Sequence, residues 1–159
     1  MASESVKDQW RTIWAGGRAI ADYVTRCPEV VKDKHVADFG AGSGVATFAA
    51  LMAGARLVEA YDINPDAVAN LKSKIVPGLV VHGESAYFKP VTADVILLGS
   101  MPISPKLLIW LIEIRYAGKN IIISSEPEFI LPKHMTKIEQ DIWSIKFPAH
   151  PLLEPKTST

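Results

Sequence analysis

Hydrophobic positions follow two alternating patterns along the chain, which predict strands and helices in turn. Apolar runs of about four to eight residues bounded by glycine or polar residues are typical of buried strands, whereas longer segments with apolar residues three and four positions apart are typical of helices. The predicted strands lie at about 36–39, 56–63, 78–83, 93–100 and 120–127. The predicted helices lie at about 17–26, 44–55, 64–75 and 104–120.

Helix-capping residues support two of these helices. Asn64 precedes Pro65, and Ser104 precedes Pro105, and a polar cap followed by proline at the first helical position is a typical helix start. Because helices alternate with strands that are apolar on both sides, the sequence predicts an α/β fold with a single doubly wound, mostly parallel sheet and helices on both faces.

The carboxyl-terminal part of the sequence predicts secondary structure less clearly than the rest. Only residues 136–147 have a pattern that suits regular structure, and we expect a helical turn and one last strand there. Residues 154–159 are polar and rich in hydroxyl groups, so we expect a disordered tail. We expect the whole chain, 1–159, to form one domain, since its length suits a single core.

Composition narrows the classes of function. Seventeen basic and seventeen acidic residues cancel among 159 residues, so the net charge gives no support for a nucleic-acid or membrane partner. The single cysteine excludes an internal disulfide, and no apolar run is long enough to span a bilayer, so we expect a cytoplasmic protein. The four histidines show no helical pairing and no cysteine companion, and we therefore expect no metal site.

The segment "VADFGAGSG", residues 36–44, places an acid and three glycines at the end of the first predicted strand. Ligands of doubly wound sheets bind beyond the carboxyl ends of the strands, and glycines allow the backbone to approach a ligand closely. A dinucleotide fingerprint would need glycine at position 45, which is valine, and a P-loop would need a lysine followed by serine or threonine. Neither phosphate-binding motif is present.

Three acids follow three successive predicted strands, namely Asp38, Asp62 and Glu84. Asp62 lies eighteen residues beyond Gly44, close to the spacing at which a carboxylate accepts ribose hydroxyl protons. An acid near the glycines suits a cationic ligand and repels a phosphate, and Glu84 could accept from an adenine amino group. These features together indicate S-adenosylmethionine. The alternatives are that Asp38 only caps a turn and that Glu84 is a surface acid.

The motifs "VADFGAGSG", "AYDINPDAV" and "HGES" resemble those of class I S-adenosylmethionine-dependent methyltransferases. The stretch around them is similar to the branch that contains the electron-transfer-flavoprotein β-subunit lysine methyltransferase, the ribosomal L11 methyltransferase and nicotinamide N-methylase-like proteins. The resemblance implies a Rossmann-like methyltransferase fold, and we expect it to be shortened because the segment "SAYFKPVTA" leaves little room for the usual crossover helix. It also implies a cofactor held by Asp38, Gly40, Ala41, Gly42, Gly44, Asp62, Ile63, Glu84 and Ser85, and by Trp14 and Gly16 in a Trp-x-Gly-Gly element. Packing of the first helix is an equal alternative for Trp14.

The expected acceptor side departs from the pattern of the lysine-methylating relatives. In those relatives the fourth strand is followed by approximately Asp-x-x-Tyr. This chain has Ser100 in place of the acid and Ile103 in place of the aromatic residue. Glu126 and Glu128 lie at and just past the end of the fifth predicted strand, at the same edge of the sheet, and could replace the missing acid. We therefore take Ser100 and Glu126 as the candidate catalytic residues.

The favoured hypothesis is a methyltransferase that acts on nitrogen, either on a protein lysine or on a small-molecule amine. One alternative is a non-catalytic S-adenosylmethionine-binding protein that has lost its acceptor site, which Ser100 and Ile103 keep open. A second alternative is a nucleic-acid amino methyltransferase, against which the balanced charge argues. The sequence leaves the methyl acceptor and the oligomeric state open.

Overall fold

The computed structural model describes residues 6–12, 15–84, 92–99, 119–124, 135–139 and 142–146. The helical elements are η1 (Val6–Arg11), α1 (Ala15–Arg26), η2 (Pro28–Val30), α2 (Val45–Met52) and α3 (Pro65–Lys72). The strands are β1 (His35–Phe39), β2 (Leu57–Tyr61), β3 (Leu79–His82), β4 (Val95–Leu98), β5 (Asn120–Ser124), β6 (Met135–Glu139) and β7 (Ile142–Lys146). The helix predicted over 104–120 lies almost wholly outside the described residues.

Strands β1 to β7 form one sheet in the order β3-β2-β1-β4-β5-β7-β6. The pairings among β1 to β5 are parallel, and β7 pairs antiparallel with β5 and β6. The predicted α/β fold with a mostly parallel, doubly wound sheet is confirmed. Because β1 has β2 on one side and β4 on the other, the strand order reverses at β1, and its carboxyl end is the place where ligands bind in such sheets.

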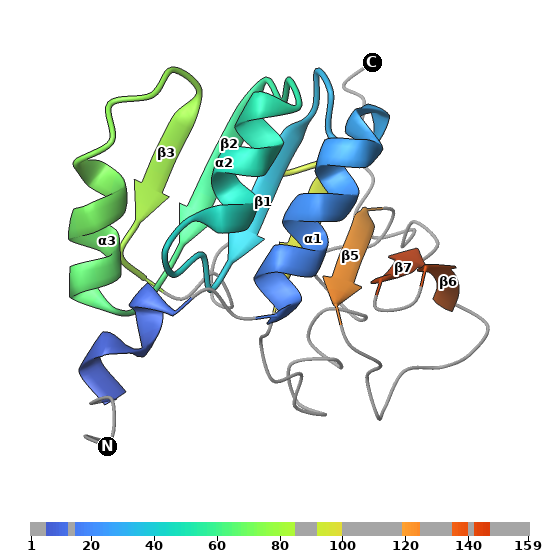
Figure 1. Ribbon diagram of the computed structural model, residues 1–159. Helices are drawn as coiled ribbons and strands as arrows, with labels where there is room; N and C mark the ends of the chain where they lie inside the picture. The colour runs from blue at the N-terminus through green and yellow to red at the C-terminus, as the bar shows by residue number, and fades with distance from the viewer. Residues whose placement is uncertain are drawn as a thin grey trace, which may run out of the picture.

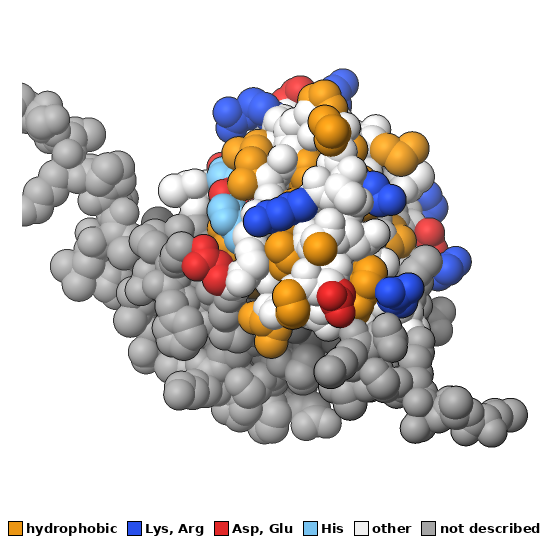
Figure 2. All heavy atoms as spheres, turned by 90° about the vertical axis from the view of Figure 1, so that its left-hand side faces the viewer, with side chains coloured by type: hydrophobic (Ala, Val, Ile, Leu, Met, Phe, Trp, Pro, Cys, Tyr) orange, Lys and Arg blue, Asp and Glu red, His pale blue; other side chains and the backbone are white. Residues whose placement is uncertain are grey.

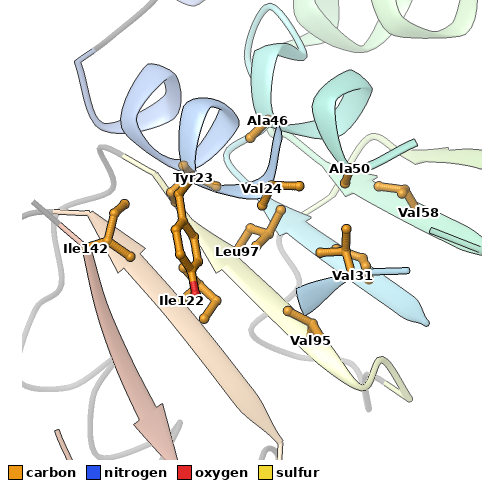
Figure 3. Packing of buried hydrophobic residues seen from close by; sticks show 12 residues of the cluster. Tyr23, Val24, Val31, Ala46, Ala50, Val58, Val95, Leu97, Ile122 and Ile142 are labelled. Atoms are coloured by element: carbon orange, nitrogen blue, oxygen red, sulfur yellow. The ribbon is translucent and has the colours of Figure 1, made fainter. Parts of the chain in front are cut away.

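The core lies between the sheet and helices α1 and α2, which cover one of its faces (Figure 1). In Figure 3, Val24 of α1 and Ala50 of α2 lie above Val58, Leu97 and other strand side chains. These small and branched side chains are almost completely excluded from solvent, which lets helices and strands approach closely. The result is a rigid base beneath the carboxyl edge of the sheet, the edge to which the strand arrows of Figure 1 point.

The tail prediction was wrong in one part. The segment 136–147 contains strand β7 and most of β6, instead of a helical turn and a single strand. The antiparallel ladder that β7 forms with β5 supplies hydrogen bonds that residue propensities along the segment do not reveal. Arg26 at the end of α1 also pairs with Glu139 of β6 through both terminal guanidinium nitrogens, which connects the tail to the helical layer.

Charged and apolar side chains are mixed on the side of the molecule formed by β3 and α3. Figure 2 shows lysine and arginine side chains interspersed there with hydrophobic ones and with acids. This face therefore carries no large patch of a single charge. No helix in the described part of the chain has the length and apolar character needed to cross a bilayer. The predicted single domain over 1–159 and the disordered tail at 154–159 remain predictions.

Candidate functional site

The loop from Gly40 to Gly44 joins β1 to α2 with left-handed backbone at every glycine. The φ angles are 68° at Gly40, 53° at Gly42 and 87° at Gly44, a region that side chains with a Cβ rarely adopt. A Cβ at Gly44 would also lie 2.6 Å from Cε2 of Phe48 and 2.7 Å from Cδ2 of Leu71. The alternate spacing of the glycines is therefore a requirement of this turn.

The glycine loop is attached to β2 through one carbonyl group. The backbone N–H groups of Gly40 and Ala41 both donate to the carbonyl oxygen of Tyr61, at 2.9 and 3.0 Å. Ala41 is buried against Ala60 and Leu71. These contacts therefore fix the position of the glycine loop relative to the ends of β1 and β2.

Asp62, the first residue after β2, connects the glycine loop to the start of α3. Its Oδ2 accepts the backbone N–H of Gly42 at 2.8 Å, and its Oδ1 accepts the backbone N–H of Asn64 at 2.8 Å. The Asn64 side chain in turn accepts from the N–H of Asp66 at 2.9 Å, which confirms the predicted helix cap. A carboxylate has about four acceptor positions, so Asp62 retains acceptor capacity for a ligand.

Asp38 occupies a different environment, beneath the loop. Only 2% of the residue is exposed, and its Oδ2 accepts the hydroxyl of Thr47 in α2 at 2.6 Å. Burial raises the pKa of Asp38 to about 7, and the nearby charge of Asp62 acts in the same direction. The structure therefore places the Asp38 carboxyl group against α2, beneath the glycine loop.

Ile63 and Glu84 follow the ends of β2 and β3. Ile63 is 78% exposed although it is apolar, and Glu84 is half-buried. The backbone N–H of Asp62 donates to the carbonyl oxygen of His82 at 3.1 Å, so the two strand ends are held together. This arrangement leaves an apolar side chain and an acid beside Asp62.

The first turn of α1 lies against the end of β4. A Cβ on Gly99 would lie 3.0 Å from Cα of Gly17 and 3.1 Å from its nitrogen, so the two backbones are almost in contact. Gly16, a predicted cofactor residue, is in this turn and therefore at the carboxyl edge of the sheet. Four other predicted site residues lie outside the described residues, namely Trp14, Ser85, Ser100 and Glu126.

A cluster of polar side chains on β1, β2 and β3 was missed at the sequence level. Glu59 accepts hydrogen bonds with both carboxylate oxygens, from Nε2 of His35 at 2.7 Å and Nε2 of His82 at 3.0 Å. The His82 ring stacks on Tyr61 at 4.4 Å between ring centres. In the described part of the chain, no group of three or more His, Cys, Asp or Glu side chains is arranged to hold a metal ion.

Thr47 was also missed, although the sequence held a signal for it. It is the one polar residue in the otherwise apolar helix Val45–Met52, and a buried hydroxyl needs a partner. That partner is Asp38. Thr47, a polar residue in the apolar helix that follows the glycines, therefore indicated that the side chain of Asp38 turns inward to meet it.

Comparison with known proteins agrees with this geometry. Residues 23–97 match the family of the ribosomal protein L11 methyltransferase, PrmA. The electron transfer flavoprotein beta subunit lysine methyltransferase of Homo sapiens is 43% identical over 56 residues, which are 35% of this chain and 21% of that protein. The ribosomal protein L11 methyltransferase of Acinetobacter baumannii (strain AYE) is 41% identical over 76 residues, 42% of this chain and 25% of that protein.

The similarity of sequence covers a limited part of each relative. The matched stretches span 21% of the human protein's length and 38% of the Danio rerio protein's length. Among solved structures, an RNA methyltransferase from Salinibacter ruber in complex with S-adenosyl-L-homocysteine has a TM-score of 0.68 and 17% identity, covering 84% of this chain and 93% of that chain. At this identity the likeness concerns the fold.

Proposed function

From the relationship of this chain to the S-adenosylmethionine-dependent methyltransferases, in the branch of the L11 and electron transfer flavoprotein lysine enzymes, we propose that it binds S-adenosylmethionine and methylates a nitrogen. The observation that carries the proposal is the position of Asp62. Its carboxylate bridges Gly42 and Asn64 at the edge of the sheet where ligands of this fold bind.

The residues at this edge fit an adenosyl group. Asp62 accepts the ribose hydroxyl protons with the acceptor positions that the backbone leaves over. Ile63, exposed beside it, provides an apolar surface for the adenine ring. Glu84 accepts from the adenine amino group, together with Ser85. The left-handed glycines allow the ligand to lie directly on the backbone of the loop.

The same residues fit a phosphate group poorly. Asp62 contacts the glycine loop through the N–H of Gly42, and Asp38 lies beneath the loop against Thr47. A phosphate would face negative charge there. S-adenosylmethionine carries a sulfonium and an ammonium group, and both are attracted by that charge. When bound, it supplies an activated methyl group.

The proposed acceptor is a protein lysine, with a small-molecule amine as the second choice. Two relatives are an electron transfer flavoprotein beta subunit lysine methyltransferase and a ribosomal protein L11 methyltransferase. A lysine amine must lose its proton before its lone pair can form the new N–C bond, and positioning in line with the methyl group then contributes several kcal/mol. We assign acceptance of that proton to Glu126 and orientation of the amine to Ser100.

A non-catalytic S-adenosylmethionine-binding protein remains the second candidate. The specific observation in its favour is that this chain has Ser100 and Ile103 at the positions where the resemblance to the lysine methyltransferases implies an acid and an aromatic residue. Neither side chain provides a strong base or a surface for a cation. The two candidates share the cofactor site and differ only in turnover.

Calorimetry and a turnover assay test the proposal in sequence. Titration with S-adenosylhomocysteine should give a micromolar dissociation constant, and absence of heat under those conditions contradicts both candidates. Cell extracts incubated with methyl-labelled S-adenosylmethionine should then acquire label on lysine. The matched control is Gly42→Arg, which places a long side chain on the loop. Binding without label above this control supports the non-catalytic protein.

A further inference from the structure

Helix η1 lies on the glycine loop. The carbonyl oxygen of Trp10 is 3.4 Å from the position that a Cβ on Gly42 would take. Figure 1 shows η1 at the carboxyl edge of the sheet, next to the start of α3. Trp10 therefore approaches the same glycine whose N–H donates to Asp62, although it is thirty-two residues from Gly42 in the sequence and belongs to a separate element.

The indole group of Trp10 has an unusual property. Its Nε1 is buried, and no hydrogen-bond acceptor reaches it among the described residues. Buried indole N–H groups normally have a partner, since a buried donor without one costs about 1–3 kcal/mol. It is the single buried side-chain nitrogen or oxygen of this kind in the described part of the chain.

The ring is held by its neighbour. The guanidinium carbon of Arg11 lies 5.0 Å from the centre of the Trp10 ring, a distance typical of a cation–π contact. This contact favours one orientation of the indole. The unpartnered N–H therefore belongs to a ring of restricted orientation, on a residue whose backbone carbonyl lies beside the glycine loop.

We propose that Trp10 is part of the cofactor site, with its indole N–H donating to a ribose hydroxyl oxygen of S-adenosylmethionine. This inference rests on the proposed function. An indole donates and does not accept, so its partner must be an acceptor. A ribose hydroxyl that gives its proton to Asp62 keeps lone pairs that can accept from Trp10. Asp62 accepts from the N–H of Gly42, and the backbone carbonyl of Trp10 lies beside the same glycine. The two side chains thus take opposite hydrogen-bonding roles toward the same hydroxyl groups.

Substitution of Trp10 by phenylalanine tests this assignment, because it keeps an aromatic ring and removes the N–H. Calorimetry should show S-adenosylhomocysteine bound about fivefold to tenfold more weakly, the range expected for one hydrogen bond. The loss should be equal for 5′-methylthioadenosine, which has the ribose hydroxyls and lacks the carboxylate. Trp143→Phe in β7, four strands away from β2 in the sheet, is the matched control and should bind like the wild type.

Three other results of the binding measurements would contradict, in turn, the role of Trp10, the assignment to ribose and the proposed function. Equal affinity of Trp10→Phe and the wild type overturns the role of Trp10 and leaves the proposed function intact. A loss seen with S-adenosylhomocysteine alone overturns the assignment to ribose. Absence of binding to the wild type refutes the proposed function, and this inference with it.

A measurement on the wild-type chain guards against misfolding of the variant. The four tryptophans give separate indole N–H signals in a nitrogen-15 spectrum, which single phenylalanine substitutions assign. Addition of S-adenosylhomocysteine should shift the Trp10 signal and slow its exchange with solvent. An unchanged Trp10 signal at saturating ligand contradicts the proposal.

Discussion

Two aspartates at neighbouring strand ends have opposite surroundings. Asp38 is the fourth residue of β1 and pairs in register with Ala60, whereas Asp62 comes directly after β2. The pleat of β1 turns Asp38 toward α2, where it is 2% exposed and bonded to the Thr47 hydroxyl. Asp62 lies beyond the sheet and accepts from two backbone N–H groups.

The comparison shows that position relative to the strand end decides what an acid does. Within the strand, alternation sends the side chain into the helical layer, and burial raises the pKa of Asp38 to about 7. One step past the strand, the carboxylate remains half-buried at the edge where a ligand binds. We therefore expect Asp38 to contribute to stability and Asp62 to contribute to binding.

The largest effect is expected at Asp62. Asp62→Ala should weaken binding of S-adenosylhomocysteine about a hundredfold, because two hydrogen bonds to a charged acceptor are lost. Its melting temperature should change little, since water can reach the half-buried N–H groups of Gly42 and Asn64. Calorimetry and thermal unfolding measure both quantities. Unchanged affinity would remove Asp62 from the proposed site.

The next largest effect is expected at Asp38. Asp38→Ala should lower the free energy of unfolding by about 2 kcal/mol, because the Thr47 hydroxyl is left buried without its acceptor. Affinity for S-adenosylhomocysteine should remain within about threefold of the wild type. Asp38→Asn, which keeps the acceptor, is the control. It should match the wild type in stability below pH 3.8, where Asp38 is protonated, and it should be close to the wild type in affinity. A variant that folds normally but does not bind would show that Asp38 contacts the ligand.

The dependence of stability on pH separates the two acids further. The pKa of Asp38 rises from its ordinary value of 3.8 to about 7 on folding. Its contribution to stability is therefore fully present below pH 3.8 and is lost as the pH rises through 7. Between these values the free energy of unfolding should fall by up to about 1.4 kcal/mol per pH unit relative to Asp38→Asn. Denaturant titrations of both chains measure the difference, and parallel pH profiles would contradict an elevated pKa.

The smallest effect is expected at Asn64, next to Asp62. Asn64→Ala removes the side-chain acceptor for the N–H groups of Asp66 and Ala67, and loss of a helix cap typically costs about 1 kcal/mol. Asn64→Ser should restore most of that stability. Affinity for S-adenosylhomocysteine should change less than in Asp62→Ala, because the backbone N–H of Asn64 still donates to Asp62. A larger loss of affinity in Asn64→Ala than in Asp62→Ala would contradict the assignment of ligand binding to Asp62.

The parallel half of the fold could be predicted because its signals are local. Continuous apolar runs, alternate glycines at 40, 42 and 44, and the Asn64 cap each predict one feature from a few adjacent residues. The hairpin of β6 and β7 could not, since it depends on the pairing of β7 with β5, which is about twenty residues away in the sequence. Pairing between distant segments leaves little trace in local propensity.

The candidate site shows the same division. The spacing between Gly44 and Asp62 predicted an acid at the right strand end, and the structure brings Asp62 to Gly42. The inward direction of Asp38 depends on strand pleat and on Thr47, and the approach of Trp10 depends on how η1 folds back over the loop. Both follow from tertiary packing and not from any short motif.

A single oxygen atom, the backbone carbonyl of Tyr61, has a mechanical consequence. It holds the Gly40 and Ala41 end of the loop, and the peptide bond that it belongs to leads directly into Asp62. Any strain that displaces the end of β2 must therefore carry the loop and the acid along together. The gap between them is thus set by two hydrogen bonds and one peptide bond, and it would survive deformations that reshape the rest of the edge.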